Sequence, residues 1–93
     1  MKTKIKKVKV LPYTASIKVL GKVYTSTGSS TKEAIENLKA GNVAKGMSVL
    51  TLSRGKNSHS VILPPNQTFR LFTPSRLMRE VAIKQISMRF PEL

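Results

Sequence analysis

The sequence predicts one small basic α+β domain, in which an antiparallel sheet carries helices on one of its faces. The chain has 93 residues, so residues 1–93 have the size of a single domain. Several segments alternate apolar and polar side chains with the period of a strand, and two others show helical spacing. In chain order these segments give β-β-α-β-β-β-α, with a further strand expected after the second helix.

The N-terminal part, residues 1–28, is predicted to be a Lys-rich β-hairpin. Residues 4–11 mix Lys with Ile and Val in partial alternation, which favours a half-buried strand. Residues 12–14 begin with a proline and are expected to form the turn. Residues 15–27 alternate again and are predicted to pair with the first strand, with a bulge at Gly21.

The first helix is predicted over residues 30–41. Its start has the pattern of a capping box, in which the Ser30 hydroxyl accepts a hydrogen bond from the backbone N–H of Glu33. The carboxylate of Glu33 is expected to reach back to the start of the helix. Apolar residues follow at helical spacing, and Gly41 ends the pattern.

The remainder, residues 46–93, is predicted to be rich in strands. Residues 47–53 and 61–63 have the pattern of two strands in a hairpin around a polar, turn-rich loop. Pro-Pro-Asn then breaks the second strand, and a third strand is expected over residues 68–72.

A short helix is predicted near residues 74–80, because Thr73 is a favourable N-cap and Pro74 a favourable first helical residue. Residues 85–90 (QISMRF) alternate strictly between polar and apolar, which favours a final strand over about residues 82–90. One long helix over residues 74–88 is the competing interpretation.

The net charge indicates the class of partner. The chain carries 17 Lys and Arg against 4 Glu and no Asp, which gives +13 at pH 7. This surplus creates a positive field that attracts polyanions, whereas a net charge of about 2–8 is enough to keep a small domain soluble. The expected partner is therefore a nucleic acid first, and an acidic protein surface second.

Other classes of site are excluded by composition. The chain has no Cys and one His, which excludes disulfides, thiolate metal sites and Cys nucleophiles. No metal and no cofactor are therefore predicted. No apolar run approaches the roughly 18 residues that a membrane-spanning helix needs, and the basic N-terminus lacks the pattern of a secretory signal. The expected location is the cytoplasm.

Three groups of residues are the candidate nucleic-acid-binding residues. The first is the N-terminal Lys ribbon, whose Lys18 and Lys22 are expected on one face beside Tyr24. The second is a hairpin tip whose Arg and Asn side chains suit base edges. The third lies near the start of the second helix, where phosphate is attracted. In that order they are Lys4, Lys6, Lys7, Lys9, Lys18, Lys22 and Tyr24; Arg54, Lys56, Asn57 and His59; and Arg70, Arg76 and Arg79. Each group also suits an ordinary solvated surface.

The aromatic residues bear on the kind of nucleic acid, because single-strand binders stack bases on exposed rings. Phe69, Phe72 and Phe90 lie in apolar alternation and are predicted to be core residues. Tyr13 and Tyr24 are the remaining stacking candidates. DNA and RNA both stay open at this point.

An enzymatic function would depend on His59, as a general base for RNA cleavage. The α-β-β-β-α order expected over residues 31–80 resembles that of the double-stranded-RNA-binding domain. The small HicA-type RNase toxins share this order and carry Ser-His on the sheet, to which Ser58-His59 is similar. Asn57 stands where that family has Gly, so the resemblance is one of topology and assigns no family.

The sequence therefore predicts a non-enzymatic nucleic-acid-binding protein that contacts the phosphate backbone through a Lys-rich β-ribbon. The alternative is an interaction module, of the accessory or phage type, that docks its basic face on an acidic protein. A small RNase that uses His59 is the weaker alternative. Open sheet edges would also allow a homodimer.

Overall fold

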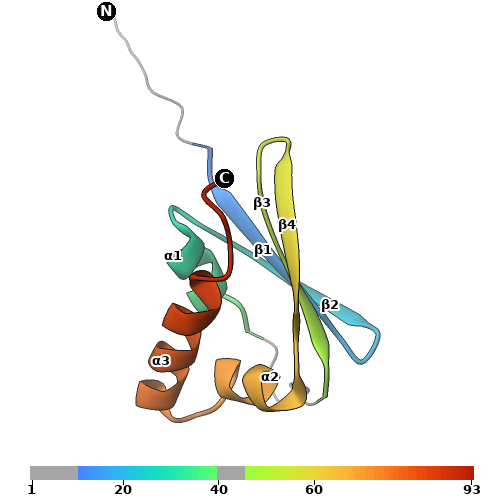
Figure 1. The fold of residues 1–93 in the computed structure, drawn as a ribbon, viewed down its shortest axis with the longest axis vertical. Coiled ribbons are helices and arrows are strands. Elements are labelled where there is room, and N and C mark those ends of the chain that lie inside the picture. The colour runs from blue at the N-terminus through green and yellow to red at the C-terminus, as the bar shows by residue number, and fades with distance from the viewer. Residues whose placement is uncertain (1–10, 40–45) are drawn as a thin grey trace, which may run out of the picture.

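The computed structural model describes residues 11–39 and 46–93, in which four strands form one antiparallel sheet with three helices beside it (Figure 1). The predicted α+β class is confirmed. All three helices lie on the same side of the sheet in Figure 1. The elements are β1 (Tyr13–Val19), β2 (Lys22–Gly28), α1 (Thr31–Glu36), β3 (Ser48–Arg54), β4 (Asn57–Leu63), α2 (Pro65–Leu71) and α3 (Arg76–Ser87).

The sheet has the strand order β2-β1-β3-β4 and consists of two tight hairpins joined side by side. Leu20 and Gly21 form the turn of the first hairpin and both have positive φ (53° and 76°), as a type I′ turn requires. Gly55 provides the positive φ of the second turn (61°). Because β1 and β3 are antiparallel, the two turns lie at opposite ends of the sheet.

The N-terminal hairpin differs from its prediction. The predicted strand 4–11 lies outside the described residues except for its last residue. The predicted turn at residues 12–14 is wrong, since β1 begins at Tyr13. The predicted single strand 15–27 is two strands, because the chain reverses at Leu20 and Gly21 instead of bulging. Leucine rarely adopts positive φ, so its position before Gly21 is a weak turn signal.

The capping box at the start of α1 is confirmed. The Ser30 Oγ accepts a hydrogen bond from the Glu33 backbone N–H (3.1 Å). The Glu33 carboxylate reaches back one residue further, to the backbone N–H and the hydroxyl of Ser29 (2.5 and 2.8 Å). The helix ends at Glu36, short of the predicted end at residue 41. Asn37, its C-cap, donates a side-chain hydrogen bond to the Thr27 carbonyl of β2 (2.8 Å).

The strand predicted over residues 68–72 is wrong, because this segment belongs to α2. Pro65 stands in the first turn of the helix, where its missing N–H costs nothing, so the Pro-Pro pair ends β4 and begins α2. Thr68 and Leu71 are buried at helical spacing. The Thr68 hydroxyl bonds to the Ser48 hydroxyl of β3 (2.8 Å), which ties the helix to the sheet.

The final strand predicted over residues 82–90 is also wrong, and the competing single helix is close to what is observed. Helix α3 runs from Arg76 to Ser87, beyond the short helix expected near residues 74–80. Its N-cap is Ser75, whose hydroxyl accepts from the Met78 N–H, and not the predicted Thr73.

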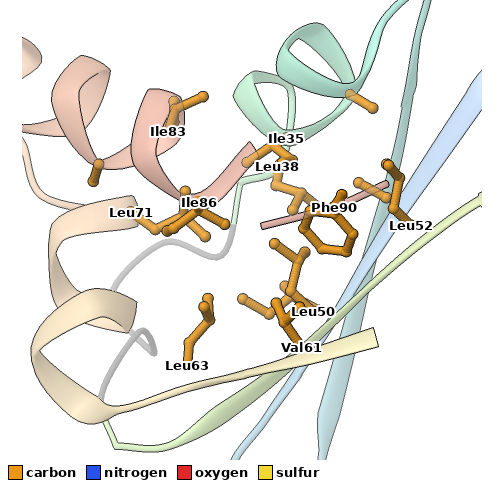
Figure 2. Close-up of a cluster of buried hydrophobic side chains, with 14 residues drawn as sticks. Ile35, Leu38, Leu50, Leu52, Val61, Leu63, Leu71, Ile83, Ile86 and Phe90 are labelled. Carbon is orange, nitrogen blue, oxygen red and sulfur yellow. The ribbon is translucent and has the colours of Figure 1, made fainter. Parts of the chain in front are cut away.

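The core lies between the inner face of the sheet and the helices. Figure 2 shows side chains of α1, α2 and α3 converging on those of β3 and β4. Phe90, beyond the end of α3, belongs to this cluster as predicted, and Phe72 packs against it, whereas Phe69 is 54% exposed. The labelled core residues are Ile35, Leu38, Leu50, Leu52, Val61, Leu63, Leu71, Ile83, Ile86 and Phe90.

The resemblance in element order is not found. Because residues 68–72 are helical, the order from α1 to α3 is α-β-β-α-α. The α-β-β-β-α order on which the likeness to the double-stranded-RNA-binding domain depended is therefore wrong. No helix within residues 11–39 and 46–93 is long and apolar enough to cross a membrane.

Candidate nucleic-acid interface

The face of the sheet turned away from the helices, here called the open face, is a regular surface. Residues paired across neighbouring strands point to the same side, so the outward side chains form three rows from β2 to β4. None of them is buried. The rows are Val23, Lys18, Val49 and Ile62; then Thr25, Ser16, Thr51 and Ser60; then Thr27, Thr14, Ser53 and Ser58.

The second and third rows consist entirely of Ser and Thr, and we call these eight residues the hydroxyl grid. Within it, the hydroxyls of Thr51 and Ser60 are hydrogen-bonded to each other (2.8 Å). Hydroxyl groups donate to phosphate oxygens in many nucleic-acid complexes. The three rows contain no aromatic side chain. The open face can therefore contact a sugar-phosphate backbone, but it offers no ring on which a base would stack.

The acidic residues lie outside the sheet. The four described strands have seven residues each and contain no Asp or Glu. All four Glu of the chain lie in α1, in α3 or in the segment after α3. With Lys18 among its side chains and no acid, the open face has a positive potential without internal compensation.

The prediction that Lys18 and Lys22 share a face is wrong. Lys18 is paired with Val23 and lies on the open face, whereas Lys22 is paired with Val19, a core residue on the opposite face. The turn between the two lysines interrupts the alternation on which the prediction depended. Tyr24 also lies on the inner side of the sheet, half-buried against the core.

The tip of the second hairpin brings part of the second predicted group together. The Arg54 guanidinium lies over the Tyr13 ring (4.9 Å to the centroid), and its Nη1 donates to the Tyr13 hydroxyl (3.1 Å). This stacking holds Arg54 in place, while Lys56 is exposed in the turn. Asn57 is paired with Arg54 across the hairpin. Lys4, Lys6, Lys7 and Lys9 lie outside the described residues.

His59 is not arranged with Ser58 as a catalytic pair. Ser58 belongs to the open face, whereas the alternation of the strand turns His59 to the opposite side, next to Leu52. The His59 ring meets the edge of Phe90 at a centroid distance of 5.7 Å and an interplanar angle of 80°. The observed role of His59 is therefore to pack on Phe90.

The third predicted group is divided among different surroundings, and Arg79 is the most constrained of its members. Its guanidinium donates to three backbone carbonyls, those of Leu71 (2.8 Å), Glu36 (2.6 Å) and Leu38 (3.1 Å). Arg79 thereby joins α3 to the ends of α1 and α2. These hydrogen bonds give Arg79 a structural role, which its position in the sequence did not indicate.

Arg76 and Arg70 lie in two different hollows. Arg76 shares a polar hollow of about 290 Å³ with Arg79 and with two acids, Glu36 and Glu80, so its charge is offset locally. Arg70 lines an apolar hollow of about 250 Å³ between α2 and α3. The three arginines of the predicted group, Arg70, Arg76 and Arg79, therefore do not come together as one phosphate-binding site.

One titratable group is clearly perturbed. The hydrogen bonds from the Ser29 backbone N–H and then from its hydroxyl lower the pKa of Glu33 below its ordinary value of 4.5. The carboxylate is fully exposed and belongs to the helix cap, so this shift has a structural cause. Within the described residues no cluster of three or more His, Asp or Glu is placed to hold a metal ion.

Sequence reasoning missed the hydroxyl grid, although a signal for it was present. Each of the four strands contributes one pair of Ser or Thr residues separated by a single residue, and such spacing places both side chains on one face of a strand. This spacing is informative only when the strand boundaries are known. The first hairpin was predicted in the wrong place, so the signal was missed.

The comparisons with known proteins identify no relative. The chain matches no protein-family model, and neither the curated proteins nor the solved structures contain a significant match to it. The functional argument therefore depends on the chain's own geometry.

Proposed function

We propose that the chain is a cytoplasmic, non-enzymatic nucleic-acid-binding protein that contacts the phosphate backbone with the open face of its sheet. The observation that carries this proposal is the division of charge: the strands hold no acid, and all four Glu lie elsewhere. A polyanion laid on the open face meets Lys18 and the hydroxyl grid, and no carboxylate among the strand residues repels it.

The residues that precede the described chain are rich in lysine. Leu11, where the described chain begins, lies beside Gly55 in the turn that also contains Lys56. Lys9 is two residues from Leu11 along the chain, and four more lysines precede it. The proposed contacts are to phosphate and sugar, which fix a backbone without reading bases, so binding is expected to depend little on sequence.

The test is a titration of labelled single-stranded and duplex DNA and RNA, measured by fluorescence anisotropy at about 50 and 200 mM salt. Six to ten phosphate contacts would give a slope of log K against log salt of roughly −5 to −9 on duplex DNA. Replacing Lys18 and Lys56 with Gln should reduce the slope by about 0.9 for each phosphate that the variant no longer neutralises. A slope near zero would overturn the proposal.

The matched control replaces Lys32 and Lys84 with Gln. These lysines lie on α1 and α3, so the control removes the same charge from the helical layer. It should leave the affinity and the salt slope close to those of the parent protein. An equal loss in both double variants would mean that net charge alone drives association, and the open face would have no special role.

An interaction module is the second candidate, and one observation favours it. Large apolar side chains surround Lys18 at the end of the sheet opposite the grid, and a hollow of about 340 Å³ lies among them. Exposed apolar patches of this kind mark protein contacts. A complex that survives nuclease digestion and is lost on Ile62→Ser would favour this candidate. The exposed residues are Leu20, Val23, Met47, Val49 and Ile62.

A further inference from the structure

Helix α3 carries apolar side chains on two opposite sides. Ala82, Ile83 and Ile86 enter the core. A surface helix normally turns polar residues to solvent. In α3 the outward side instead presents Leu77 and Val81, which are 73% and 49% exposed and one helical turn apart. Such an exposed apolar stripe is typical of an interaction site.

This stripe borders a concave surface, which we call the docking groove. It is a largely apolar hollow of about 250 Å³ between α2 and α3. A concave apolar surface accepts a projecting side chain of a protein segment, as in the recognition of an amphipathic helix by a groove. Met78 adds an adaptable wall, because methionine side chains repack easily around different partners. The groove is lined by Arg70, Leu77, Met78, Val81, Ala82 and Gln85.

The charges at the groove indicate the sign of its partner. Arg70 is part of the lining, and none of the lining residues is acidic. Glu80, the acid of α3, lines the polar hollow that also contains Glu36. A second copy of this chain would bring another +13 to the contact, which opposes self-association through this surface. Charge complementarity therefore favours a partner with acidic residues around its apolar anchors.

We propose that the docking groove binds an amphipathic helical segment of an acidic protein. Its apolar side chains, at helical spacing, enter the hollow against Leu77 and Val81, and a carboxylate pairs with Arg70. The groove lies between α2 and α3. Figure 1 shows both helices on one side of the sheet, and the proposed nucleic-acid contacts belong to the other side. The proposal therefore does not depend on the nucleic-acid function, and both partners can be bound together.

The test is a selection on the full-length protein from a displayed library of random peptides of about 16 residues, roughly four helical turns. We expect selected peptides to combine Asp or Glu with Leu, Ile or Phe at helical spacing. Their affinity should fall about tenfold or more in the double variant Leu77→Gln, Val81→Gln, as for the loss of an interface anchor. Arg70→Gln should weaken the acidic peptides by a smaller factor.

The control is the double variant Leu11→Gln, Met88→Gln. It removes two apolar side chains that are 49% and 74% exposed and do not line the groove, and it should leave peptide affinity unchanged. Both pairs are exposed, so circular dichroism should show folded protein in each case. The proposal would be overturned if no peptides were selected, or if the selected peptides lacked acidic residues. It would also be overturned if the peptides bound both double variants with equal affinity.

Two further measurements exclude the other occupants of the groove. The first is binding to vesicles of phosphatidylcholine and phosphatidylserine in equal amounts. If the double variant Leu77→Gln, Val81→Gln loses vesicle binding but still binds the peptides normally, the stripe is a lipid contact and the proposal is overturned. A dimer in sedimentation that dissociates in the same variant would assign it to a second copy, with the same consequence.

Discussion

The open face of the sheet and the outer side of α3 are both exposed, but their side chains differ in kind. The open face presents the hydroxyl grid and Lys18, with its apolar residues confined to one row. The outer side of α3 presents Leu77 and Val81 beside an apolar groove. A charged or hydroxyl-bearing surface retains its water at low cost, whereas apolar side chains left in water favour burial.

The difference teaches that one small core can support two surfaces of opposite chemistry. Each strand divides its residues between core and open face with a period of two. Helix α3 divides its residues between core and groove with the helical period. Of the four changes below, the second compares the two surfaces directly, and the other three test contacts that support the fold beneath them.

The largest effect is expected for Arg79→Ala, which removes the connection among the three helices. The loss of charged hydrogen bonds to three carbonyls should lower the free energy of unfolding by about 3 kcal/mol. Denaturant titration followed by circular dichroism measures this change. Arg79→Lys, which keeps the charge but not the planar fork of donors, should recover less than half. A change below about 0.5 kcal/mol, as for an ordinary surface site, would contradict the role of Arg79.

The next effect concerns the open face alone. Thr25→Glu with Ser58→Glu places two acids on the edge strands β2 and β4, and should weaken nucleic-acid binding about tenfold at low salt, or about 1.4 kcal/mol. Anisotropy titration measures it. Gln85→Glu with Met88→Glu makes the same change of charge at the C-terminal end of α3 and should have a much smaller effect. Equal losses would contradict the assignment of the contact to the open face.

A smaller effect is expected where α2 is attached to the sheet. Thr68→Val leaves the buried Ser48 hydroxyl without its partner, and should cost about 1 kcal/mol of stability. Adding Ser48→Ala should recover part of the loss, because both polar groups are then removed together. Thermal unfolding of the two single variants and the double variant gives the coupling between them. Strict additivity would show that the two hydroxyls do not interact.

The smallest effect is expected at Glu33. Its pKa is lowered in the folded protein, so its stabilising contribution is fully present above the ordinary value of 4.5 and is lost as the pH falls through the lowered pKa. Glu33→Gln should therefore lower the Tm slightly at pH 7. The difference from the parent protein should disappear in strongly acidic solution. A difference that stays constant over this range would mean that the charge of Glu33 contributes nothing.

Local signals in the sequence predicted the parts of the fold that local contacts determine. The capping box of Ser30 and Glu33 is made within one helical turn, and it was predicted correctly. Helix α2 was missed because its buried residues, Thr68 and Leu71, meet partners that are remote in sequence. The final strand was predicted because Ile86, Met88 and Phe90 alternate with polar residues, but α3 runs to Ser87 and the other two apolar residues lie just beyond it.

The candidate site was predicted only in part, for a related reason. Lys18 was recognised from its charge, but its neighbours on the open face come from three other strands. The role of Arg79 depends on carbonyls more than 40 residues distant along the chain, at Glu36 and Leu38. The sequence around Arg79 does not indicate which carbonyls accept its hydrogen bonds, so these acceptors are known only from the folded structure.

Arg79 also has a consequence for the order in which the chain folds during synthesis. Glu36 ends α1 and Leu71 ends α2, so one guanidinium satisfies carbonyls at the C-terminal ends of two helices, where the helix dipoles favour a cation. With six and seven residues, these helices are too short to be stable alone. A nascent chain therefore completes its helical layer only after residue 79 has left the ribosome.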